Sequence, residues 1–129
     1  MSELPYRRLE VWQKAMALAM EVLDLAETEG LARRFYFRDQ MCAAAMSVPA
    51  NIAEGNGRST PLDYAAFLDR ARGSLFELDT WLLAAGQRSY VPADAAAAFS
   101  PRIEELSAML RSLAIQLRRK PSLDSRSPR

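Results

Sequence analysis

The sequence contains no histidine, one cysteine and only five glycines among its 129 residues. Without histidine it has no Ser-His-Asp or Cys-His catalytic pair, no Cys/His zinc site and no imidazole that titrates near neutral pH. A single cysteine excludes an intrachain disulfide, and the apolar neighbours of Cys42 indicate a small buried side chain. We therefore expect a protein that is not an enzyme and that uses no cofactor or metal.

The sequence also lacks a long apolar segment. The uninterrupted apolar run from Ala15 to Met20 is far shorter than the roughly 20 residues that cross a bilayer. The charged segment from Met1 to Glu10 does not contain the apolar stretch of a signal peptide. Hydrophobic residues nevertheless make up 50% of the chain, which is enough for a compact core. We expect a cytoplasmic protein with no membrane partner, organised as one domain over residues 1–119 and a disordered basic tail over residues 120–129.

The net charge is only +1, but the basic side chains are unevenly distributed. Residues 118–129 contain five basic side chains and one acidic side chain, whereas the rest of the chain contains 12 basic and 15 acidic ones. A second group of arginines is expected near the joint of the first two helices. Each group either belongs to a solvated surface or contacts the phosphates of a nucleic acid. The candidate nucleic-acid contacts are Arg7, Arg8, Arg33, Arg34, Arg38, Arg118, Arg119 and Lys120.

Apolar residues recur every three or four positions along most of the chain, which is the period of an α-helix. This pattern predicts helices over residues 5–28, 32–54, 61–86 and 92–119, and no segment alternates as a β-strand would. Four helices joined by short loops predict antiparallel neighbours. The expected fold class is therefore all-α, an up-down antiparallel four-helix bundle.

Glycine, proline and threonine mark the expected ends of these helices. Gly30 is expected to cap the first helix, and the glycines of the segment Gly55–Arg58 are expected to end the second with positive φ angles. Pro49 lies inside the second helix and predicts a kink there. Thr60 is a favourable N-cap for the third helix. Pro101 either restarts or bends the fourth helix.

The first predicted helix carries more apolar surface than one small core needs. Two adjacent apolar stripes merge into an arc of roughly 200° around the helix axis. The first stripe, which includes Trp12 and Met16, has the spacing of a bundle seam. The second stripe, which includes Leu18 and Val22, is expected to face another subunit. The arc therefore predicts a homo-oligomer.

Polar side chains form a row beside the apolar face of each central helix. Ser47, Asn51 and Glu54 are spaced by four and three residues in the second helix. Ser74 and Glu77 have the same spacing of three in the third helix. One interpretation is a hydrogen-bonded network that fixes the register of the two helices. The alternative is that Glu54 and Glu77 act as acid and base or hold a divalent metal, although the Glu-x-x-His motif of di-metal bundles is absent.

Three sequence blocks resemble a known family. The segments Leu9–Ala15, Ser47–Gly55 and Ala71–Leu82 are similar, in order and spacing, to the signature blocks of the 23S rRNA-intervening-sequence proteins. The middle block is the most specific, because a serine, a proline inside a helix and then Asn-Ile-Ala-Glu-Gly form an uncommon combination. The resemblance covers residues 6–117 and implies a bacterial four-helix bundle that assembles into a homopentamer.

The resemblance also implies two roles. The family itself suggests a non-enzymatic, homo-oligomeric scaffold or interaction protein. The alternative comes from a related branch, the accessory proteins of diversity-generating retroelements, and is a factor that binds RNA or a reverse transcriptase through the arginines named above. Within the motif, Gly73 is expected to let another backbone approach closely. The motif residues of the expected structural network are Ser47, Pro49, Asn51, Glu54, Gly55, Gly73, Ser74, Glu77 and Thr80.

Overall fold

The computed structural model describes residues 4–124 of the chain, with side chains described as far as residue 119. Over that part the chain forms helices and no β-strand, so the predicted all-α class is confirmed. None of these helices is long and apolar enough to cross a membrane. The long helices are α1 (Glu10–Ala26), α3 (Phe35–Asn56), α4 (Pro61–Gln87) and α6 (Ser100–Asp124). The short helices are the 3-10 helix η1 (Pro5–Arg8), α2 (Glu29–Ala32) and α5 (Ala93–Ala97).

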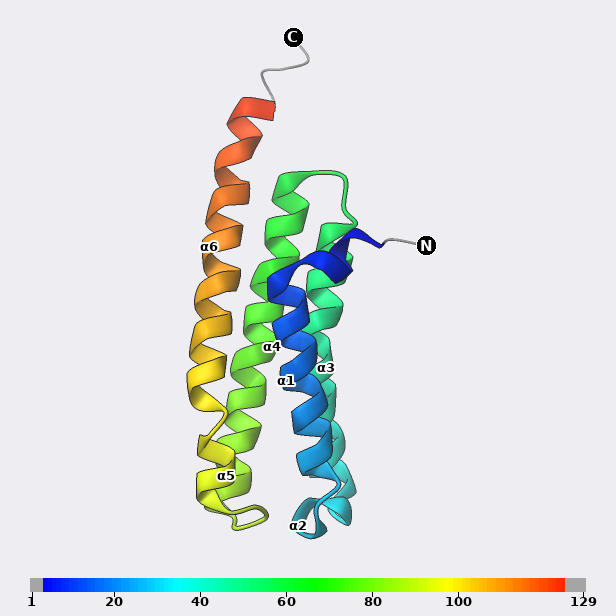
Figure 1. Cartoon of the computed structure of the whole chain (residues 1–129), viewed down its shortest axis with the longest axis vertical. Helices are drawn as coiled ribbons and strands as arrows, with labels where there is room; N and C mark the ends of the chain where they lie inside the picture. The colour runs from blue at the N-terminus through cyan, green and yellow to red at the C-terminus, as the bar shows by residue number, and fades with distance from the viewer. Residues whose placement is uncertain (1–3, 125–129) are drawn as a thin grey trace.

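The four long helices lie side by side (Figure 1). α1 packs on α3, α3 packs on α4 and α4 packs on α6, while direct contacts between α1 and α6 are few. The chain reverses direction from each long helix to the next, so the start of α1 and the end of α6 lie at the same end of the molecule (Figure 1). α1 and α6 therefore form the loosest pair of neighbouring helices.

The core is built from the facing sides of all four long helices. Leu75 and Leu78 of α4 are completely buried. Leu18 and Val22 of α1 are also buried, with 2% and 0% of their surface exposed. The prediction that this stripe of α1 faces another subunit is therefore wrong. Both residues lie on the second stripe, and this side of the apolar arc packs into the core formed with the other long helices.

The first predicted helix is divided at Leu9. This residue has an extended conformation and separates η1 from α1, so the chain turns before the long helix begins. Gly30 was expected as a cap but lies within α2. A Cβ atom added at Gly30 would be 1.8 Å from the carbonyl oxygen of Tyr90, which follows α4. The glycine is therefore explained by a close approach between two connecting segments and not by a helix end.

The other expected helix ends are partly confirmed. The backbone N–H of Asp63 donates to Thr60 Oγ1 at 3.1 Å, so Thr60 caps α4 as predicted. No glycine in residues 4–124 has a positive φ angle, and a Cβ added at Gly55 would be 2.7 Å from Cβ of Phe67. Gly55 therefore allows α3 and α4 to pack closely. It does not make a turn.

The last predicted helix consists of two helices. α5 ends at Ala97 and α6 begins at Ser100, directly before Pro101, so the proline restarts the helix. α6 continues to Asp124, which places residues 120–124 in a helix although they were predicted to belong to a disordered tail. The remaining residues of that tail, 125–129, lie outside the described residues.

Candidate functional site

A small hydrogen-bonded group joins α3 to α4. Ser47 Oγ and Ser74 Oγ are 2.7 Å apart across the interface. The side-chain amide of Asn51 donates to the carbonyl oxygen of Ser47 at 2.8 Å and to its hydroxyl at 2.9 Å. All three side chains are half-buried. This group is the part of the predicted network that the structure brings together, and it links one turn of α3 to α4.

The two glutamates predicted to share this network lie apart from it. Glu54 is exposed and pairs with Arg58 at 3.2 Å, one turn later on the same segment. Glu77 is exposed and accepts a hydrogen bond from the indole N–H of Trp81 at 3.3 Å. Among the described residues, neither carboxylate forms a hydrogen bond with the serines or with the other carboxylate. Glu54 instead pairs with a residue just beyond the end of α3, and Glu77 pairs within its own turn of α4.

The structure does not bring Glu54 and Glu77 together at one point. Each carboxylate is held by a separate partner. Among the described residues, no group of three or more acidic, cysteine or histidine side chains is close enough to hold a metal ion.

The remaining motif residues divide between the core and the surface. Pro49 and Gly55 are buried in α3. Thr80 is exposed on α4, where its hydroxyl donates to the carbonyl oxygen of Phe76 at 2.9 Å. Gly73 is exposed in the middle of α4, and a Cβ added there would meet no atom within 4 Å. The close backbone approach predicted at Gly73 therefore does not occur within one chain.

The arginines predicted to cluster at one joint are separated by the length of α1. Arg7 and Arg8 lie on η1, before α1, whereas Arg33, Arg34 and Arg38 follow it (Figure 1). Arg7 and Arg8 precede α1, so the whole length of that helix separates them from the joint that follows it. Within one chain the two groups cannot contact the same short ligand.

The third group of candidate arginines lies on α6. Arg118 makes a short ion pair with Asp69 of α4, which ties the last turns of α6 to the start of α4. Arg119 is exposed on the same turn. Lys120 lies in the helical backbone of α6, but its side chain is outside the described part of the chain.

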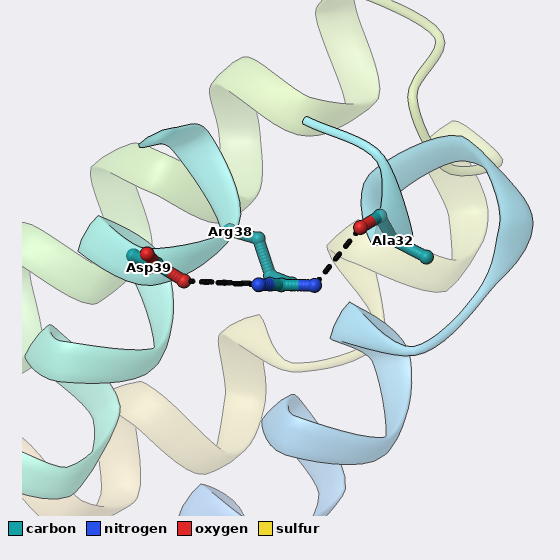
Figure 2. Close-up of polar contacts among 3 residues, drawn as sticks. All are labelled: Ala32, Arg38 and Asp39. Carbon is teal, nitrogen blue, oxygen red and sulfur yellow. Dashed lines mark hydrogen bonds and ion pairs between the residues drawn. The ribbon is translucent and has the colours of Figure 1, made fainter. Parts of the chain in front are cut away.

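Arg38 holds the joint between α2 and α3 together. Figure 2 shows its guanidinium between the carboxylate of Asp39 and the backbone carbonyl of Ala32. Nη1 donates to the Ala32 oxygen at 2.9 Å, and Nη2 lies 3.3 Å from Asp39 Oδ1. The guanidinium carbon is also 5.1 Å from the centre of the Phe35 ring. Arg38 is therefore a structural residue whose charge is largely matched by Asp39.

An aromatic chain that the sequence analysis missed runs beside this joint. The ring centres of Tyr36 and Trp81 are 6.4 Å apart, those of Trp81 and Phe37 are 4.8 Å apart, and those of Phe37 and Tyr90 are 5.2 Å apart. All three contacts are edge-to-face, the geometry that ring quadrupoles favour. The signal in the sequence was the uninterrupted run Phe35-Tyr36-Phe37 directly after two arginines.

Arginines enclose the far end of this aromatic chain. The guanidinium of Arg34 lies 4.0 Å from the centre of the Tyr90 ring, and its Nε donates to the carbonyl oxygen of Gly30 at 3.1 Å. Arg88 reaches the same ring from the turn after α4. A hydrogen bond from Arg88 lowers the pKa of the Tyr90 hydroxyl. Aromatic rings and guanidinium groups from three segments thus converge at this end of the molecule.

A shallow seam separates α1 from α6 on the opposite side of the structure. Two cavities of about 470 and 450 Å³ open along it. Leu9 and Met109 line the first, and Leu25 and Phe99 line the second. Between them, two ion pairs cross the seam: Lys14–Glu105 at 3.4 Å and Arg102–Glu21 at 2.6 Å.

The described residues form a helical protein whose distinctive side chains lie on its surface and at helix ends. A comparison with family models then shows that residues 7–112 match the family described as 23S rRNA-intervening sequence protein. The chain belongs to this family, and the resemblance inferred from the three sequence blocks is confirmed. The comparison with curated proteins gives no significant match.

Proposed function

We propose that the protein is a non-catalytic, homo-oligomeric interaction protein of the bacterial cytoplasm, built on an up-down antiparallel four-helix bundle and assembled as a pentamer. The observation that carries the proposal is an apolar row left outside the core on α1. Met16, Met20 and Leu23 are spaced by four and three residues and so lie on one flank of the helix. Met20 is 41% exposed, and the other two are only half-buried.

This flank faces away from the seam with α6. Lys14 pairs across that seam, and Met16 lies roughly 200° around the helix axis from it. A row of large apolar side chains that neither α6 nor the core covers is typical of a contact with another chain. The apolar arc predicted from the sequence is thus divided: one side of it fills the core, and the other side remains for a partner.

Gly73 on α4 supports the proposal independently. Glycine in the middle of an exposed helix costs about 1 kcal/mol of stability relative to alanine. Within one chain no neighbouring atom explains this cost, since a Cβ at Gly73 would meet nothing. A second chain that approaches the α4 backbone closely at Gly73 supplies the missing reason.

The two surfaces favour a closed ring over a symmetric dimer. α1 and α4 both pack on α3 and share no substantial contact with each other, so they occupy opposite corners of the structure. A contact between the α1 flank of one copy and the α4 face of the next would join different surfaces. Contacts of this kind generate rings when the rotation closes. The pentamer implied by the family resemblance is one such ring.

The experiment that tests the proposal is light scattering of the purified full chain at micromolar concentration. The expected molar mass is about five times the chain mass of 14.4 kDa. Gly73→Leu should dissociate the assembly, because the added side chain would occupy the space of the second chain. It should not lower the stability of the monomer, where that space is open. A monomeric wild-type protein would overturn the proposal.

Ala108→Leu provides the matched control, because it places the same side chain at an exposed position of α6, a helix that neither proposed contact uses. It should leave the assembly intact. If the two leucine variants dissociate to the same extent, the contact is not specific to Gly73.

A further inference from the structure

We propose that the end of the molecule formed by α2, the first turn of α3 and the turn after α4 binds an unpaired nucleic-acid strand. The bases would stack on Phe35 and Tyr36, and the phosphates would contact nearby arginines. This site is built within one chain. It does not depend on self-association.

Two aromatic rings at this end are unusually open to solvent. Phe35 is 63% exposed and Tyr36 is 74% exposed, which makes them the most exposed large hydrophobic side chains in residues 4–119. They are consecutive on a helix, so they point roughly 100° apart and do not merge into one continuous apolar patch. Separate rings, each accessible from solvent, are suited to receive separate bases.

The rings are held in position before any ligand binds. Tyr36 rests with edge-to-face geometry against Trp81, which itself contacts Phe37. Phe35 lies beneath the guanidinium of Arg38, which Asp39 and the Ala32 carbonyl fix in place (Figure 2). Because these rings are already positioned, they lose little conformational entropy on binding. The free energy gained by stacking is therefore not offset by an entropy cost of ordering the rings.

The positive charge at this end is only partly neutralised. Arg38 is matched by Asp39, but Arg33, Arg34 and Arg88 make no ion pair with an acidic side chain among the described residues. Arg34 uses its Nε to bind the Gly30 carbonyl, which leaves its terminal nitrogens available as donors. Glu27, which precedes α2, and Glu29, within α2, reduce the local charge without matching all three arginines.

The combination of rings and arginines favours an unpaired strand over the other ligands. Stacking on aromatic side chains tolerates any base, because every base has a π-face, and arginines track the phosphates. A duplex keeps its bases stacked inside the helix and cannot use Phe35 or Tyr36 in this way. A protein partner would need a continuous apolar centre, and this end has two separate rings.

The test is fluorescence anisotropy with the full-length protein and a fluorescein-labelled single-stranded RNA of about eight nucleotides and mixed sequence, long enough for a small stacking site. DNA of the same sequence and the corresponding RNA duplex form the other arms. Both single strands should bind, and the duplex should bind at least ten-fold more weakly. Equal or tighter binding of the duplex would overturn the proposal.

Substitutions at the rings and at an arginine distinguish the contribution of base stacking from the contribution of phosphate contacts to binding. Tyr36→Ala and Phe35→Ala should each weaken binding of the single strands by about ten-fold. Arg33→Gln should weaken binding and reduce the dependence of log affinity on log salt concentration by roughly 0.7, the value for one phosphate contact on a single strand. A salt dependence equal to that of the wild type would contradict a phosphate contact at Arg33.

Phe76→Ala is the matched control, because Phe76 is an exposed ring on α4 that also lies beside an arginine, Arg72. It should leave the affinity unchanged. Circular dichroism should show that all variants keep the wild-type helicity, since Phe35 and Tyr36 are exposed. Failure of the wild type to bind any single strand at low salt, or equal losses for Phe76→Ala and Tyr36→Ala, would overturn the proposal. A protein partner that binds this end of the molecule, together with an absence of RNA binding, would also overturn the proposal.

Discussion

The interface between α3 and α4 and the seam between α1 and α6 show two different ways of joining neighbouring helices. Between α3 and α4, buried leucines such as Leu75 and Leu78 pack closely, and the Ser47–Ser74 hydrogen bond crosses between the helices. Between α1 and α6, contacts are fewer, cavities remain open, and two ion pairs between exposed side chains cross the seam.

The difference shows where the stability of the chain resides. Burial of apolar side chains contributes a few kcal/mol for each large residue, whereas exposed ion pairs contribute at most about 1 kcal/mol. α3 and α4 are also consecutive long helices joined by a short turn, while α1 and α6 are the first and the last. The α3–α4 pair therefore forms the stable centre, and the α1–α6 pair contributes less to the stability of the fold.

The largest expected effect comes from removing a side chain at the centre. Leu78→Ala on α4 should lower the free energy of unfolding by about 2–5 kcal/mol, because Leu78 is completely buried and a cavity would remain. Leu113→Ala at the seam removes the same atoms from a half-buried site, so it should lower the free energy of unfolding by clearly less. Urea unfolding followed by circular dichroism measures both. Equal losses would remove the distinction between the two regions.

The hydrogen-bonded group at the α3–α4 interface should give the next largest effect. Asn51→Ala and Ser74→Ala should each cost about 0.5–1.5 kcal/mol, because both side chains bond to Ser47. The double variant should be non-additive, since the two residues share that partner. Glu77→Gln lies outside the group and should stay within about 0.5 kcal/mol of the wild type. Additive single effects would show that the three residues do not act together.

The ion pairs of the seam should matter less and should depend on salt. Glu105→Gln should lower the free energy of unfolding by about 0.2–1 kcal/mol in low salt, because both partners of the Lys14–Glu105 pair are substantially exposed. The difference from the wild type should nearly vanish at an ionic strength of about 1 M, where charges are screened over a few ångströms. A loss that persists in high salt would mean that the seam is closed by packing.

The smallest effect concerns the thiol of Cys42, which lies on α3 beside the core. Burial raises the pKa of this thiol above its usual value. The folded protein therefore favours the neutral thiol. The stability that comes from keeping Cys42 neutral is fully present at a pH below the thiol pKa of the unfolded chain, and it is lost as the pH rises through the thiol pKa of the folded protein. Ellman's reagent should react with native Cys42 more slowly than with glutathione at pH 8. A faster reaction would contradict the neutral, partly covered thiol.

The sequence predicted the helices well because their apolar residues repeat with a clear period. The cap at Thr60 and the restart at Pro101 also followed from local chemistry, since each acts on its own helix end. The role of Gly30 could not be predicted, because it depends on Tyr90, which is distant in the sequence. Residues whose role comes from a distant neighbour are those that periodicity does not reveal.

The candidate site was predicted less completely for a related reason. The spacing of Ser47 and Asn51 placed them together on one row, and the structure joins them to Ser74, which was predicted on the row of the facing helix. Glu54 and Glu77 lie on the same two rows, yet each side chain turns to a partner four residues later in its own segment of the chain. Helical spacing determines which residues share a row, but it does not determine which way a long side chain turns.

The central claim is that one helix, α1, uses its inner side for the core and its outer flank for another chain. Light scattering of Met20→Glu at micromolar concentration tests this claim most directly, with Leu18→Glu as the matched variant two residues earlier. Met20→Glu should be a monomer with the helicity of the wild type, whereas Leu18→Glu should lose its helical structure because Leu18 is buried. An assembly of wild-type mass for Met20→Glu would contradict the account.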